Sequence, residues 1–108
     1  MTLDRLPQGT LDLLILRTLA PAPRHGYAIA RWIEDTTDDA LAVEEGALYP
    51  ALYRLQRRGW IHAEWARSEL GKDIKVYELT ADGRAELRKR SAGWTALVAA
   101  MTKVLKAR

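Results

Sequence analysis

The sequence has 108 residues, among which there is no cysteine and there are only two histidines, His25 and His62. The lack of thiols excludes disulfides, thiolate nucleophiles and thiolate metal sites, and it fits a reducing compartment. The two histidines lie in different predicted elements, without a carboxylate or hydroxyl partner at a recognisable spacing. A glycine-rich phosphate loop is missing as well. We therefore predict no enzyme activity, no metal site and no cofactor.

Long apolar runs are also missing. No segment approaches the roughly 20 apolar residues that cross a bilayer, and Asp4, Gly9 and Asp12 interrupt any signal-peptide pattern. Hydrophobic residues make up 48% and charged residues 29% of the chain, a composition typical of one small globular domain. The sequence predicts a cytoplasmic protein that does not contact membranes.

Positive charge is concentrated toward the C-terminus, although the formal net charge is only +3. Residues 1–50 hold four basic and eight acidic side chains, whereas residues 81–108 hold seven basic and two acidic ones. A basic surface supplies the sequence-independent part of nucleic-acid affinity, because each Lys or Arg on a phosphate releases counterions. The distribution is weak evidence by itself, since many basic proteins bind nothing anionic.

Three segments in the first 60 residues have helical spacing. Thr10 is a good N-cap for a helix over about residues 11–19, whose apolar residues surround it so fully that some must face a second partner. After the breaker-rich loop "PAPRHG", a second helix is predicted over about residues 25–35. The third begins at Glu45 or Gly46 and ends at Gly59. Its apolar stripe at i, i+3, i+4 and i+7 consists of Leu48, Ala51, Leu52 and Leu55.

Alternation then predicts a β-hairpin, with strands in "WIHAEWARSE" and "IKVYELT" joined by a turn at "LGKD". Thr80 can cap a last helix over about residues 81–107. At roughly 40 Å, this helix is longer than a domain of this size covers. Its apolar positions keep a spacing close to 3.5 residues, as in a helix that pairs with another helix. With Leu13 of the first helix, the residues predicted to form a homodimer interface are Leu87, Trp94, Leu97, Val98, Met101, Val104 and Leu105.

The third helix has a second face that is neither good core nor ordinary solvent surface. Its residues are Gly46, Tyr49, Pro50, Tyr53, Arg54 and Arg57. The order of elements describes a mainly α fold with a small β-hairpin, the winged helix-turn-helix, in which the third helix enters the DNA major groove and the hairpin wing lies along the backbone. We divide the chain into a DNA-binding domain over residues 1–80 and a dimerisation helix over residues 81–108.

Several phrases in this order resemble the PadR family of transcriptional regulators. They are "GTLDLLILRTL", "HGYAIARWIE", "EEGALYPALYRLQRRGWI" and "KVYELTADG", followed by Trp94 after a basic run. The resemblance covers the chain from about Leu6 to its end. It implies a homodimeric repressor that binds double-stranded DNA at an imperfect palindrome, with the C-terminal helix against the first helix of the partner. The ArsR and MarR winged-helix families fit less well, because they do not supply the Leu-Tyr-Pro phrase.

The resemblance also bears on Pro50, which lacks an N–H and would clash with the carbonyl of Gly46 one turn back. In a helix that begins at Glu45 or Gly46, the proline lies in the second turn, and the glycine leaves space for the distortion. Tyr49 and the small residues then lie nearest the bases, whereas Arg54 and Arg57 lie farther along, where phosphates or a guanine edge are expected.

The wing departs from the family pattern. Its tip "ELGKDIK" keeps Lys72 and Lys75, opposed by Glu69 and Asp73, so we expect a weaker grip on the DNA backbone. Helix N-termini present free N–H groups to anions and are expected to add phosphate contacts. The residues predicted for these contacts are Gln8, Thr10 and Tyr27.

Trp94 has two interpretations. It is a large apolar anchor of the dimer interface, or, as in some PadR-like proteins, it flanks a cavity that stacks a planar aromatic effector and thereby changes the spacing of the two recognition helices. The lining predicted for such a cavity is Leu11, Ile15, Trp94, Leu97 and Val98. The alternative function is a winged helix used for protein contact without specific DNA binding, since Trp32, Trp60, Trp65 and Trp94 are as compatible with a protein interface as with a core.

Overall fold

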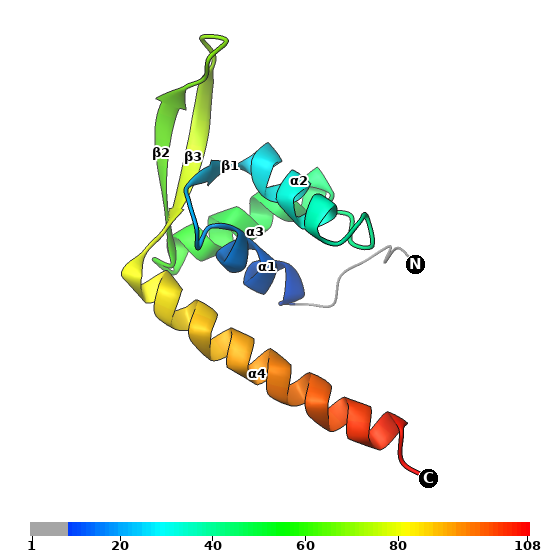
Figure 1. Ribbon diagram of the computed structural model, residues 1–108. Helices are drawn as coiled ribbons and strands as arrows, with labels where there is room; N and C mark the ends of the chain where they lie inside the picture. Colours follow the sequence, from blue (N-terminus) through cyan, green and yellow to red (C-terminus); the bar gives the residue numbers. More distant parts are fainter. Residues whose placement is uncertain (1–8) are drawn as a thin grey trace.

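The computed structural model describes residues 9–108, which form four helices and three strands (Figure 1). In chain order, the elements are α1 (Thr10–Thr18), β1 (Arg24–His25), α2 (Gly26–Thr36), α3 (Glu45–Arg57), β2 (Ile61–Arg67), β3 (Asp73–Leu79) and α4 (Ala81–Leu105). The predicted fold class is confirmed: the chain is a winged helix-turn-helix followed by a long C-terminal helix.

Capping residues explain where two of the helices begin. His25 precedes α2, and its Nδ1 accepts a hydrogen bond from the Ala28 N–H at 3.3 Å. Thr80 precedes α4, as predicted, and its hydroxyl oxygen accepts from the Gly83 N–H at 3.0 Å. Each cap satisfies an N–H group that has no acceptor within its own helix.

Glycines set two further helix boundaries. The prediction that Thr10 caps α1 is wrong, because the helix begins at Thr10 itself and Gly9 precedes it with a φ of 83°. Glycine adopts that left-handed conformation readily, so the chain enters the helix one residue earlier than the threonine suggests. At the other boundary, Gly59 follows α3 with a φ of 77° and ends it as predicted.

The strands form one antiparallel sheet in the order β1, β3, β2. β2 and β3 pair along their whole length, from Ile61 opposite Leu79 to Arg67 opposite Asp73, and make the wing. On the other edge of β3, β1 pairs through residues 24–25, a segment predicted to be only a loop. That prediction is wrong because a strand of two residues has no alternation from which it could be recognised.

The core lies between α1, α2, α3 and the base of the wing. Tyr77 and Leu79 of β3 face it and are buried. Trp65 alternates with Ile61 and Ala63 along β2, but it is 71% exposed because the wing extends beyond the helices (Figure 1). The largest fully buried side chains are Ile15, Leu16, Leu19, Ile29, Ile33, Leu48, Leu52, Leu55 and Ile61.

A close contact at Gly83 attaches α4 to the winged helix. A Cβ atom at this position would overlap the Trp60 carbonyl oxygen and lie 2.8 Å from Leu79 Cδ1. The Trp60 ring in turn lies near two guanidinium groups, those of Arg58 at 5.1 Å and Arg90 at 4.9 Å. Beyond this junction α4 extends away from the body, which makes the molecule 60 Å long (Figure 1). Within residues 9–108, no helix is long and apolar enough to cross a membrane.

Candidate nucleic-acid interface

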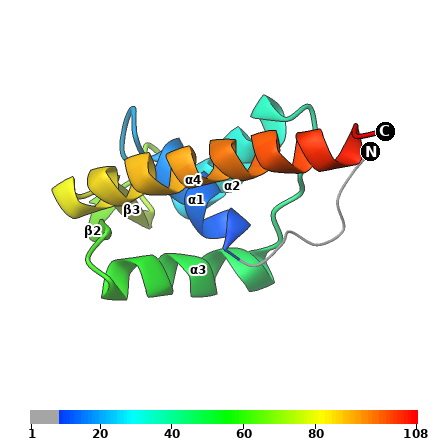
Figure 2. The same ribbon diagram turned by 90° about the horizontal axis from the view of Figure 1, so that it is seen from below.

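α3 carries a line of exposed residues on the side opposite its buried side chains. Gly46, Pro50, Tyr53 and Arg57 are exposed and follow one another at steps of four, three and four residues, so they lie along one side of the helix. We call them the outward stripe. Tyr53 is 61% exposed, and the Arg57 guanidinium lies 5.8 Å from its ring. Figure 2 shows α3 along one side of the molecule and α4 along the other.

Contacts with other helices fix both flanks of the outward stripe. On one flank, the Tyr49 ring packs against Gly26 at the start of α2, where an added Cβ would lie 3.0 Å from ring atom Cε1. On the other flank, Arg54 Nη2 donates a hydrogen bond to Asp12 Oδ1 of α1 at 2.9 Å. Both residues stay accessible, since Tyr49 is 48% exposed and the Arg54 side chain 56%. Burial, and to a smaller extent the neighbouring Tyr49, raises the pKa of the Tyr77 hydroxyl, which remains neutral.

Charge is unevenly distributed along α3. Glu44 and Glu45 are exposed at its N-terminal end, whereas Arg54, Arg57 and Arg58 border an open hollow of about 320 Å³ near its C-terminal end. The guanidinium groups attract anions and the carboxylates repel them. Anions such as phosphate groups are therefore favoured at the C-terminal half.

The other residues predicted to contact phosphates lie outside α3. Lys72 is exposed at the tip of the wing, and Lys75 lies farther down β3, with Nζ 5.8 Å from the ring of an exposed tryptophan on β2. Tyr27 is 66% exposed at the start of α2. Thr10 borders a hollow between α1 and α4. Gln8 lies outside the described residues.

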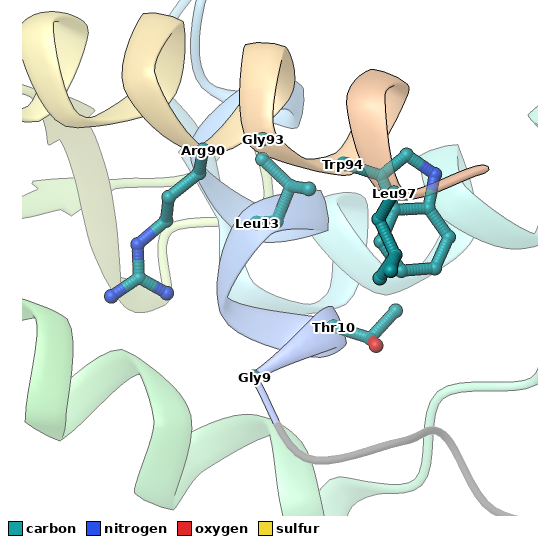
Figure 3. Close-up of a pocket in the computed structure, with 7 residues that line it drawn as sticks. All are labelled: Gly9, Thr10, Leu13, Arg90, Gly93, Trp94 and Leu97. Atoms are coloured by element: carbon teal, nitrogen blue, oxygen red, sulfur yellow. The ribbon is translucent and has the colours of Figure 1, made fainter. Parts of the chain in front are cut away.

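That open hollow has a volume of about 310 Å³. Figure 3 shows its lining, which consists of Gly9, Thr10, Leu13, Arg90, Gly93, Trp94 and Leu97. Of the residues predicted to line a cavity here, Trp94 and Leu97 border the hollow and Val98 does not. Leu11 and Ile15 lie in the core and are only 8% and 0% exposed. The physical reason is that α1 is apolar on all sides, and the side that carries Leu13 is the one that faces the hollow.

The second half of α4 presents an exposed apolar row. Its members expose between 44% and 78% of their surface, and they are Trp94, Leu97, Val98, Met101, Val104 and Leu105. Leu87 was predicted to belong to the same interface, but it packs against the core of its own chain, because this first part of α4 lies over the body. Monomeric proteins rarely expose continuous apolar patches of this kind, so the row indicates an interaction surface.

Tyr53 lies on the outward stripe, in agreement with its place on the second face predicted for the third helix. One residue of the site is missing from the predicted set. Asp12 precedes Arg54 by 42 positions, and no local pattern connects the two. In the part of the chain that the structure describes, no group of three or more His, Asp and Glu side chains is placed to hold a metal ion.

Comparison with known proteins identifies the family of the chain. A model of the transcriptional regulator PadR-like family matches residues 15–89. The chain belongs to this family. The match includes α2, α3, the wing and the start of α4, and it ends before the exposed apolar row.

Individual relatives are similar to this chain over most of their length. A PadR family transcriptional regulator from Eggerthella lenta superposes with a TM-score of 0.81 at 32% identity, over 94% of this chain and 86% of that one. A transcriptional regulator from Clostridium thermocellum gives a TM-score of 0.84 at 27% identity, over 92% and 96% of the two chains. An uncharacterized protein from Lysinibacillus sphaericus is 31% identical over 87 residues, which are 81% of this chain and 80% of that protein. As a PadR-like transcriptional regulator, this chain has DNA as its partner.

Proposed function

We propose that the protein is a homodimeric transcriptional repressor that binds an imperfect palindromic operator through the outward stripe of α3 and is released by a small-molecule effector. The observation that carries this proposal is the stripe itself. It combines small residues, an aromatic ring and a guanidinium group on the exposed side of a helix whose flanks are fixed by α1 and α2.

The composition of the stripe supports binding in the major groove. Gly46 and Pro50 add little bulk, so the N-terminal half of α3 can approach the base edges closely. Tyr49 contributes a hydroxyl at the edge of this half. Arg54 and Arg57, farther along, supply N–H donors for phosphates or for the edge of a guanine.

Residues outside α3 add contacts that position the protein without reading sequence. Lys72 and Lys75 on the wing would each neutralise a phosphate. Thr10 and Tyr27 lie at the N-terminal ends of α1 and α2, where free N–H groups attract anions. Gln8, which comes before α1 in the sequence, is proposed for a similar contact. Because Glu69 and Asp73 oppose the two lysines, we expect the wing to bind the backbone weakly and α3 to be the main source of affinity.

A second copy of the chain is the proposed partner of the exposed apolar row. The row repeats through residues 94, 97, 98, 101, 104 and 105, the spacing of a helix that packs along another helix. A two-fold dimer would present one α3 to each half-site, about 34–36 Å apart for one turn of DNA. In this arrangement residues 1–80 bind DNA in the cytoplasm and residues 81–108 join the two copies.

The hollow beside Trp94 is the proposed effector site. The indole face favours stacking of a planar aromatic molecule, and Leu13 and Leu97 add apolar surface. Arg90 is also on the lining, but its guanidinium already donates a hydrogen bond to Glu86 Oε1 at 2.9 Å. A ligand that binds one dimer geometry better than another would shift the spacing of the two α3 helices and so release the DNA.

Selection of bound duplexes from a random-sequence library, followed by affinity measurements on a recovered duplex, tests the proposal. Arg57→Gln should weaken binding by about 5- to 100-fold and lower the slope of log affinity against log salt concentration by about one. Arg88→Gln is the matched control, because it removes the same charge from an exposed position of α4, a helix that lies along the other side of the molecule from α3 (Figure 2). If no preferred duplex is recovered, or if both variants bind equally well, DNA reading by α3 is wrong and the protein-contact alternative is favoured.

A further inference from the structure

The ion pair between α1 and α3 joins a largely buried carboxylate to a largely exposed guanidinium. Asp12 lies in the first turn of α1, and its side chain is 15% exposed, whereas the side chain of Arg54 is 56% exposed. The 2.9 Å distance between Arg54 Nη2 and Asp12 Oδ1 is that of a strong charge-assisted hydrogen bond. The pair therefore has one partner anchored in the protein and the other reaching into solvent.

The anchored carboxylate leaves most of the guanidinium free. Arginine carries five N–H donors in a rigid fork, and Asp12 accepts from one of its nitrogens. The rest of the group borders the same hollow as Arg57 and Arg58, at the half of α3 where phosphates are favoured. Arg54 can thus meet a phosphate without releasing Asp12.

Asp12 affects DNA binding in two opposite ways. Its negative charge repels phosphates and so weakens binding. It also fixes the long side chain of Arg54 before DNA arrives, which strengthens binding because ordering such a side chain during association is costly. Release of Arg54 would leave a largely buried carboxylate without its partner, which is also costly. The pair is therefore expected to persist in the complex, and fixing Arg54 is the larger effect.

We propose that Asp12 is a positioning residue for DNA binding, which holds the Arg54 guanidinium at the flank of the outward stripe with its free N–H groups directed to a phosphate. This inference rests on the proposed function. The turn of α1 that carries Asp12 also contributes Thr10 and Leu13 to the hollow beside Trp94, so the pair connects that hollow to α3.

Affinities of variants for a duplex selected with the wild-type protein test the inference. Asp12→Ala should bind about tenfold more weakly than wild type, while Asp12→Asn, whose amide oxygen can still accept from Arg54, should recover most of the loss. Asp82→Ala is the matched control, since it removes a carboxylate from the first turn of α4 and should bind as tightly as wild type or slightly more tightly. The double variant Asp12→Ala with Arg54→Gln should bind DNA as tightly as Arg54→Gln alone. If Asp12 had a purely structural role, the double variant would bind more weakly than Arg54→Gln.

The outcomes separate this inference from the proposed function. Recovery of no duplex, or unchanged binding by Arg54→Gln, overturns the inference, and the first result overturns the proposed function as well. If Arg54→Gln binds weakly but Asp12→Ala and Asp12→Asn, both folded by circular dichroism, bind as tightly as wild type or more tightly, then Asp12 is not a positioning residue and DNA reading by α3 still stands.

Discussion

Truncation of Leu97 should weaken the association of two copies of the chain by an amount that the structure allows to be worked out. The side chain is 50% exposed, so about half of its apolar surface remains for a partner to cover. A Leu→Ala change in a fully packed core costs about 2–5 kcal/mol, of which about half, ~1–2.5 kcal/mol, would be felt at the interface. Because both copies carry the change, the dimer should lose ~2–5 kcal/mol, which raises its Kd by roughly 30- to 4,000-fold.

Sedimentation equilibrium over a wide range of protein concentrations measures this Kd. Leu70→Ala is the matched control, because it removes the same atoms from a leucine that is 85% exposed at the tip of the wing, outside the exposed apolar row. It should leave the Kd unchanged. A wild-type protein that stays monomeric throughout, or equal Kd values for Leu97→Ala and wild type, would refute pairing through the row.

Two further predictions concern the junction of α4. Gly83→Ala should destabilise the fold by about 3 kcal/mol in thermal or urea unfolding, because the new methyl group overlaps a backbone carbonyl that cannot move aside. Gly46→Ala, with open space around the new methyl group, is the control and should be neutral. Equal effects of the two substitutions would disprove the packing argument. The hydrogen bond from Arg90 lowers the pKa of Glu86 below its usual 4.5. Burial raises this pKa by a smaller amount, and the positive charges of Arg90, Lys89 and Arg58 lower it further. The Glu86–Arg90 pair therefore stabilises the fold above pH 4.5, and this contribution is lost as the pH falls through the lowered pKa. Wild type should lose more stability on acidification than Glu86→Gln. Equal losses in the two proteins would contradict a stabilising role for this ion pair.

The elements that the sequence predicts correctly are those with a long regular pattern. The stripe of four apolar residues on α3, the alternation of the wing and the cap at Thr80 each specify local structure without knowledge of the rest of the chain. Gly59 likewise marks the end of α3 through its own backbone preference. For these elements, local preference and tertiary structure agree.

The failures occur where partners distant in sequence decide the outcome. α1 carries apolar residues on every side, so periodicity cannot tell which side meets the core. Leu11 and Ile15 therefore lie in the core and not at the predicted cavity. Trp65 follows the inward alternation of β2 correctly, but the sequence does not reveal where the helices beneath the strand end. The flanks of the outward stripe depend on Gly26 and Asp12, whose contacts with α3 arise only when the three helices pack.

Hydroxyl-radical footprinting of the wild-type protein on a selected duplex tests the central claim most directly. If two copies joined through α4 each place one α3 in the major groove, two protected segments should appear with approximate two-fold symmetry, about 34–36 Å apart along the DNA axis. A single protected segment, or protection spread evenly along the duplex, would contradict the account.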